Sequence, residues 1–133
     1  MRKVQGRRQQ IEFAEGRQLH EYAKLYFCAR NPMLYRLLRT HKWLCVLRVD
    51  SSVLNRPGVL VTDRNAASDK CRFYQGRIGL LHVDLEKVFA TYWNRGDWNS
   101  RREHKSIKCA EVLVPDVVPS EFIVGAFLRG VSQ

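Results

Sequence analysis

The chain has 133 residues, of which 45% are apolar, and this is enough to build the core of one domain. We therefore expect a single folded domain over residues 1–133 and exclude a disordered chain. No apolar run approaches the roughly 20 residues of a membrane helix, and the basic residues 1–10 are not followed by the apolar segment of a signal peptide. A cytoplasmic protein with no membrane contact is expected.

The charge is strongly unbalanced, with 23 Lys and Arg against 13 Asp and Glu and a net charge of +10. Such a surplus predicts attraction to polyanions. Basic residues concentrate in residues 2–17, 36–48 and 95–108. Nucleic acid is the first candidate partner and an anionic cofactor the second. The charge alone leaves open a generically basic soluble protein.

The four cysteines are widely spaced and include no C-x-x-C pair, and no histidine stands at ligand spacing from them. Structural zinc sites normally show closer pairs. We predict no metal site. The cysteines are interpreted as small, mostly buried thiols of a reducing compartment.

The first elements are short. Residues 2–15 are polar and predict a short helix or arm, which Gly16 ends. Residues 19–27 mix apolar and aromatic side chains. Proline suits the first turn of a helix, so Pro32 predicts a helix over about 33–40.

Several short elements follow. Residues 43–49 have the pattern of a buried strand, and residues 50–54 predict a short helix with an Asp or Ser cap. A turn is expected at 55–58, a strand at 59–62 and a polar loop at 63–69.

Residues 78–93 show helical spacing in their second half, and a polar loop is expected at 95–100. Two strands are expected at 111–114 and 122–127. Short strands with irregularly interspersed helices favour an α+β fold. On the predicted helix we assign three apolar residues to the core: Leu85, Val88 and Phe89.

Glu111 stands where a cationic run stops and an apolar, β-branched segment begins. A carboxylate at the start of a buried strand costs desolvation free energy unless it faces a cleft, a cation or a ligand, so its position favours a functional role. The alternative is that Glu111 lies on the solvent face of an edge strand.

Several short motifs occur together in an order that resembles the DarT family, the DNA ADP-ribosyltransferase toxins of bacterial DarT–DarG systems. Each motif is weak alone, but together they extend over nearly the whole chain. They are Val4-Gln5-x-Arg7-Arg8, Leu19-His20-Glu21-Tyr22, Tyr26-Phe27-x-x-Arg30-Asn31-Pro32-Met33, Thr62-Asp63-x-Asn65-Ala66-Ala67, Tyr92-Trp93 and Ala110-Glu111-x-Leu113-Val114.

The resemblance implies an ADP-ribosyltransferase fold, a split antiparallel sheet with helices. It also implies NAD as a substrate, without a metal, and transfer of ADP-ribose to a base of single-stranded DNA, with thymine as the expected base. The implied protein partner is an antitoxin macrodomain protein of the DarG type.

Site residues are carried over position by position. Glu111 matches the catalytic glutamate, and Arg8 matches an essential arginine that also contacts NAD. The remaining matches are His20 and Tyr26 at NAD, and a DNA-facing set of Tyr26, Met33, Asn65, Arg101, Arg102, Lys105 and Lys108, of which the last four belong to the loop before the glutamate.

Those roles agree with the chemistry. Cleavage of the nicotinamide ribosyl bond develops positive charge on the ribose, and a fixed carboxylate stabilises that charge in the transition state. Glu111 is also placed to accept the proton of the attacking base nitrogen. The planar guanidinium of Arg8 suits a bidentate contact to the pyrophosphate or the base.

The chain departs from the family pattern at its start, where the His-x-Thr motif of the first NAD-binding strand is not found. We therefore expect a fold that lacks this strand, with unpaired edges and exposed apolar surface. Two alternatives remain: a catalytically inactive DNA-binding remnant of such a toxin, and an unrelated basic interaction module.

Overall fold

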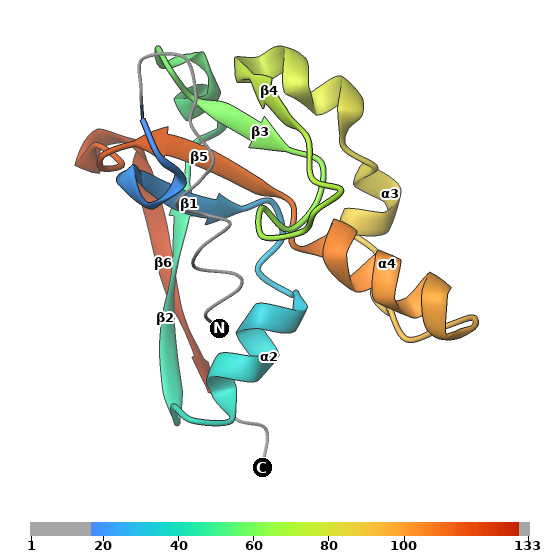
Figure 1. The fold of residues 1–133 in the computed structure, drawn as a ribbon. Coiled ribbons are helices and arrows are strands. Elements are labelled where there is room, and N and C mark those ends of the chain that lie inside the picture. Colours follow the sequence, from blue (N-terminus) through green and yellow to red (C-terminus); the bar gives the residue numbers. More distant parts are fainter. Residues whose placement is uncertain (1–16, 131–133) are drawn as a thin grey trace.

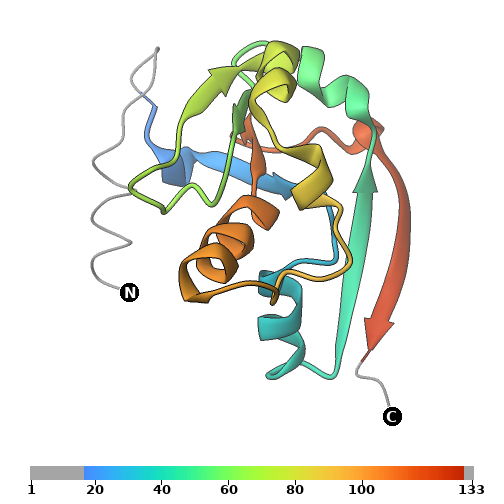
Figure 2. The same cartoon turned by 90° about the vertical axis from the view of Figure 1, so that its right-hand side faces the viewer.

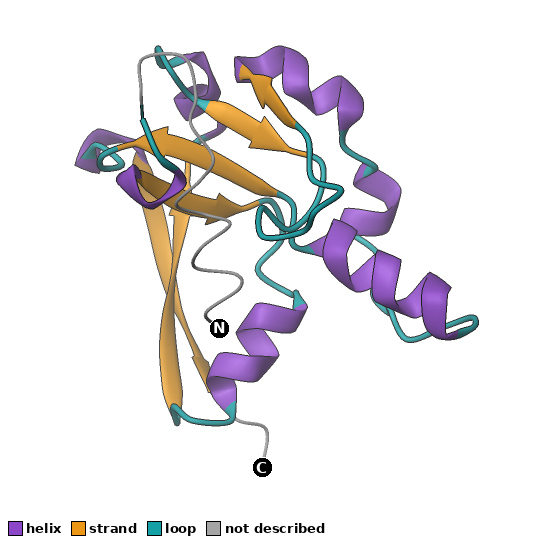
Figure 3. Cartoon of the chain, in the orientation of Figure 1, coloured by secondary structure: helices purple, strands orange, loops and turns teal. Residues whose placement is uncertain are grey.

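The structure, a computed structural model, describes residues 17–130 as a mixture of two antiparallel sheets and short helices (Figures 1 and 3). The α+β prediction is confirmed. No helix among these residues is long and apolar enough to cross a membrane. The larger sheet has four strands in the order β1 (Tyr22–Tyr26), β5 (Glu111–Pro115), β3 (Leu60–Thr62) and β4 (Phe73–Gln75).

The smaller sheet pairs β2 (Trp43–Val49) with β6 (Ile123–Gly130). These two long strands extend away from the larger sheet as a ribbon (Figure 1). The prediction of a strand at 43–49 is confirmed, but its burial is not. Both strands have largely exposed side chains, because a two-stranded ribbon offers little surface against which to pack.

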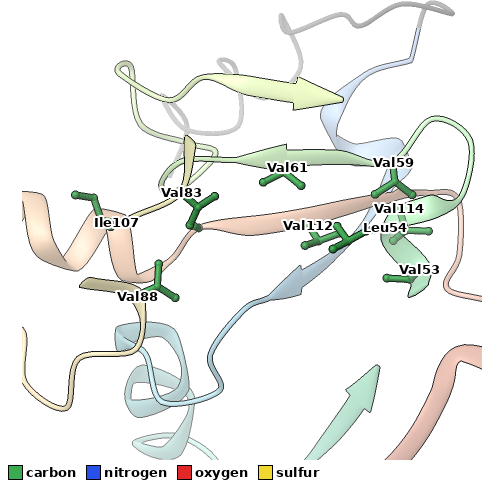
Figure 4. Close-up of a cluster of buried hydrophobic side chains, with 10 residues drawn as sticks. Val53, Leu54, Val59, Val61, Val83, Val88, Ile107, Val112 and Val114 are labelled. Atoms are coloured by element: carbon green, nitrogen blue, oxygen red, sulfur yellow. The ribbon is translucent and has the colours of Figure 1, made fainter. Parts of the chain in front are cut away.

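The main core covers one face of the larger sheet. Val61 of β3 and Val112 and Val114 of β5 alternate with residues that point to the other face, as the two-residue period of a strand requires. They pack against Val88 and Ile107 from the helical side (Figure 4). Burying each such side chain contributes roughly 1.5–3 kcal/mol.

The helices between the strands are short. They are α2 (Pro32–Leu38), α3 (Leu85–Val88) and α4 (Trp98–Lys108), with 3₁₀ helices at Leu19–Glu21, Ser51–Asn55, Gly76–His82 and Ser120–Phe122. The predicted helix start at Pro32 is confirmed, with Asn31 as its cap. The predicted short helix after Asp50 is confirmed as well.

The helical spacing in the second half of residues 78–93 predicts a helix that the structure confirms only at α3. Regular α-helix is limited to α3, and of the apolar residues assigned to the core only Val88 is buried. Leu85 and Phe89 are exposed. The four-residue helix is too short to present a continuous apolar face, so the periodic spacing has no structural counterpart after it ends.

Candidate active site

Glu111 is the first residue of β5 and only 1% of its surface is exposed. In the register between β1 and β5 it lies opposite Tyr26. Tyr26 points to the same face as Glu111, because the two residues are directly opposed. Successive residues of a strand point to opposite faces, and Val112 belongs to the main core, so Glu111 faces away from that core. Its face is shared with a second, smaller apolar cluster that includes Leu60, Ala66 and Leu113.

The carboxylate of Glu111 is fixed by the loop that follows β3. Its Oε2 accepts a hydrogen bond of 2.9 Å from the backbone N–H of Ala66. The backbone N–H of Glu111 donates to the hydroxyl of Thr62 at 2.8 Å, and that hydroxyl donates to the carbonyl of Arg64 at 2.7 Å. The alternative of a glutamate on the solvent face of an edge strand is therefore wrong: β5 is an interior strand and the carboxylate is buried.

Asn65 holds this loop against α4. Its backbone N–H donates to the carbonyl of Ser106 at 2.8 Å, and its side-chain oxygen accepts from the N–H of Ala67 at 3.0 Å. The guanidinium of Arg64 lies 3.5 Å from the carboxylate of Glu103 on α4. The sequence motif at 62–67 singled out Asn65, and it missed the roles of Thr62 and Ala66 because a backbone donor leaves no side-chain signal.

The cationic run before Glu111 is a helix, whereas the sequence predicted a loop. The helix α4 begins after Asp97, whose carboxylate accepts a hydrogen bond from the N–H of Ser100 at 2.8 Å. This bond and others from the first turn lower the pKa of Asp97 below its usual value. The exposed basic side chains of the run, all on this helix, are Arg101, Arg102 and Lys105.

Lys108 differs from its basic neighbours, because its side chain is fully buried. Its ammonium donates to the carbonyl of Val88 at 2.5 Å and lies 5.2 Å from the centre of the Trp93 ring. Burial lowers the pKa of this ammonium. The prediction of Lys108 as a DNA contact is at odds with this position: the residue ties α4 to the end of α3.

Tyr26 and Met33 line a different feature, a cavity of about 630 Å³ between β1, α2 and β2. Its volume falls within the range of small-molecule sites. Glu111 and Asn65 are not among its lining residues, so the structure does not gather all four in one pocket. Tyr26 lines the cavity and also lies opposite Glu111 in the register of β1 and β5.

Of the two other predicted contacts to NAD, only His20 lies within the described residues. His20 is exposed and precedes β1, whose far end carries Tyr26. Tyr22, at the near end of that strand, already pairs with Pro115 at the opposite end of β5 from Glu111. The structure thus does not bring His20 to the carboxylate. Arg8 and the predicted arm at 2–15 lie outside the described residues.

The cysteines are free thiols of mixed burial: Cys109 is buried, Cys28 and Cys71 are partly buried, and Cys45 is exposed. Burial raises the pKa of Cys71 to about 12, and the carboxylates of Asp63 and Glu111 add to the effect. Burial likewise raises the pKa of Cys109 to about 11. Both sulfurs beside the glutamate are therefore protonated, and neither serves as a nucleophile.

In the part of the chain that the structure covers, the side chains do not form a candidate metal site. Within residues 17–130 no group of three or more His, Cys, Asp or Glu side chains is placed to hold a metal ion. The groups that the structure places at the site are one fixed, buried carboxylate, the hydrogen bonds around it and a nearby cationic helix.

The sequence of this chain is similar to those of known proteins. Residues 1–130 match the family model described as "ssDNA thymidine ADP-ribosyltransferase, DarT". A protein of Thermosipho africanus, named a DNA ADP-ribosyl transferase–DNA ADP-ribosyl glycohydrolase fusion protein, is 34% identical over 119 residues, which are 86% of this chain and 29% of that protein.

Solved structures agree in fold. The DarT of Thermus sp. 2.9 in complex with carba-NAD+ superposes with a TM-score of 0.72 at 26% identity, covering 85% of this chain and 60% of the other. The same protein in complex with ADP-ribosylated ssDNA gives a TM-score of 0.72 at 27% identity, covering 90% and 60%. The chain thus spans less than a third of the Thermosipho fusion protein and about three fifths of the Thermus protein. The resemblance seen in the sequence motifs is confirmed, and the chain belongs to the DarT family of DNA ADP-ribosyltransferases.

Proposed function

We propose that this chain carries the catalytic glutamate and the DNA-binding face of an NAD-dependent transferase, which moves ADP-ribose onto thymine in single-stranded DNA. The observation that carries the proposal is the carboxylate of Glu111, buried and held at 2.9 Å by the N–H of Ala66. The family description and the complexes of the Thermus protein with carba-NAD+ and with ADP-ribosylated ssDNA support the choice of substrates.

Glu111 would act on charge that develops during the reaction. As the bond between nicotinamide and ribose breaks, the ribose becomes cationic, and a carboxylate that is already oriented stabilises it without reorganisation. The base nitrogen then forms the new bond to the ribose carbon, and nicotinamide leaves as a neutral molecule. The proton of that nitrogen passes to the carboxylate of Glu111.

The 630 Å³ cavity is not proposed as the NAD site. Val53, Leu54 and Val112 of the main core line it, so it opens on the face of β5 opposite to Glu111. Met33 lines the same cavity from α2. The proposed contact of Arg8 with the pyrophosphate stays a prediction.

The DNA would approach along α4. Arg101, Arg102 and Lys105 are exposed on this helix, which leads directly into the strand that begins with Glu111. Because every nucleotide carries a phosphate, a row of exposed cations supplies affinity without regard to sequence. Asn65, anchored to the same helix, is proposed to position the target base.

The fusion of transferase and glycohydrolase in the name of the Thermosipho protein supports a partner of the DarG type. We propose a macrodomain antitoxin that removes ADP-ribose from the DNA, so that the pair forms a toxin–antitoxin system. Because its substrate is the DNA of a bacterial cell, the proposed location is the cytoplasm.

The activity is tested by incubating the chain with labelled NAD and thymine-containing single-stranded oligonucleotides. We expect label on the DNA, and a loss of at least about 100-fold in Glu111→Gln, the size that removal of one electrostatic stabiliser gives. DNA affinity should be retained in this variant. Glu86→Gln, an exposed carboxylate on α3, is the matched control and should keep full activity.

Two outcomes would contradict this proposal. Equal transfer by wild type and Glu111→Gln would remove the glutamate from the reaction. DNA binding by the wild type without any transfer would favour the inactive DNA-binding remnant.

A further inference from the structure

A small pocket of about 260 Å³ lies between α2 and the segment that leads into α4. Figure 2 shows this segment passing beside α2 before the helix α4 begins. Trp93 packs against Tyr35 of α2, with ring centroids 5.6 Å apart and planes inclined by 49°. The pocket is lined by Arg30, Tyr35, Thr91, Tyr92, Trp93 and Asn94.

The pocket combines open aromatic surface with positive charge. The Tyr92 side chain is 56% exposed, and the guanidinium of Arg95 lies 5.3 Å from the centre of its ring. Arg30 is itself one of the lining residues, whereas Arg95 lies beside the pocket over the Tyr92 ring. An exposed ring beside guanidinium groups suits a flat, electron-rich ligand that carries negative charge close by.

The pocket is also coupled to the catalytic strand. The ring of Trp93 lies over the ammonium of Lys108, the last residue of α4. Only two residues separate Lys108 from Glu111. The wall of the pocket and the start of β5 are therefore joined through the contact between Trp93 and Lys108.

We propose that this pocket binds a second base of the single-stranded substrate, from a nucleotide that flanks the one to be modified. The base stacks on Tyr92, and Arg30 and Arg95 hold the adjoining phosphate. Thr91 and Asn94 offer polar groups to the edge of the base. This inference rests on the proposed function, and it adds a reason for single-strand preference, since a stacked duplex cannot present an isolated base face.

The test measures the affinity of a fluorescein-labelled, thymine-containing single-stranded oligonucleotide by fluorescence anisotropy. We expect Tyr92→Ala to bind about tenfold more weakly, within the range that loss of one base-aromatic stack produces. Tyr92→Phe keeps the ring and should bind like the wild type. Phe89→Ala removes a ring that is equally exposed at 56% but does not line the pocket, and it should also bind like the wild type.

A second arm replaces single nucleotides beside the target thymine with abasic sites. At one position the wild type should lose about tenfold in affinity, whereas Tyr92→Ala should lose nothing further, because the stack is already absent. Unchanged binding by Tyr92→Ala, or equal abasic losses in both proteins, would overturn the subsite alone. Failure of the wild type to bind any single-stranded DNA would overturn the proposed function and the subsite together.

Discussion

Lys108 and Glu111 are the two charged residues that are buried within residues 17–130. Different contacts offset the desolvation free energy of each. The carboxylate of Glu111 accepts a hydrogen bond from the backbone N–H of Ala66, in a loop on its own side of the sheet. Lys108 bonds to the carbonyl of Val88 and to the face of Trp93. Within residues 17–130 no carboxylate forms an ion pair with Lys108, and desolvation is the main cause of the lowered pKa of its ammonium.

The lowered pKa of Lys108 predicts how the free energy of unfolding changes with pH. Between the lowered native pKa of this lysine and the unfolded value of 10.5, the unfolded chain binds more protons at it than the native chain does, so the free energy of unfolding rises with pH in this window. We expect the wild type to gain stability relative to Lys108→Met as the pH rises from neutral toward 10.5. Urea denaturation at a series of pH values across this range measures the difference.

Lys105→Met provides the matched control for this experiment. Lys105 is exposed on the same helix, and its replacement should leave the stability difference from the wild type independent of pH. Ionisable groups that do not interact with either lysine are common to all three proteins and cancel, and adding Cys28→Ser to each protein removes the thiol that lies 3.9 Å from the Lys108 ammonium. A difference for Lys108→Met that stays constant or shrinks as the pH rises would show that the native state does not disfavour the ammonium.

At the scale of elements, α4 presents the cationic side chains and leads into the catalytic strand. Its start is set by Asp97, which accepts from the N–H of Ser100. Gly96, with φ of +86°, provides the turn before the cap. We expect Asp97→Ala to lower the free energy of unfolding by about 1 kcal/mol, the usual cost of losing an N-cap.

Urea denaturation followed by circular dichroism measures this change. Asp97→Asn should retain most of the stability, because an asparagine oxygen also caps a helix well. If Asn and Ala destabilise equally, the negative charge of Asp97 near the helix N-terminus matters more than its hydrogen bond. No loss in either variant would mean that tertiary contacts alone hold the start of α4.

The same helix shows where sequence patterns were sufficient and where they failed. The strand at Glu111 and the helix after Pro32 were predictable, since local signals and tertiary packing agree there. The segment before Glu111 reads as a polar loop, because α4 is strongly polar in composition and buries only Ile107 and Lys108 at its end. The Asp97 cap was its one local signal. The burial of Lys108 depends on Val88, Trp93 and Cys28, which are distant in sequence and gave no hint.

At the scale of the whole molecule, some positively charged side chains lie on the helix that precedes Glu111, and others lie on the opposite side of the larger sheet. Figures 1 and 2 show the ribbon of β2 and β6 on one side of the larger sheet and α4 on the other. Exposed arginines occur on both sides. A net charge of +10 explains attraction to DNA in general, but only the cations on α4 lead into the strand of Glu111.

Salt dependence separates these two contributions. Neutralising one phosphate releases bound counterions and adds about 0.7 to the slope of log affinity against log salt for a single strand. The triple variant Arg101→Gln, Arg102→Gln, Lys105→Gln should therefore reduce the slope by about 2. A matched variant on the opposite side, Arg48→Gln, Arg56→Gln, Arg129→Gln, removes the same charge and should change the slope much less. Anisotropy titrations over a range of salt concentrations give both slopes. Equal reductions would mean that DNA is attracted by the overall charge and does not follow α4 to Glu111.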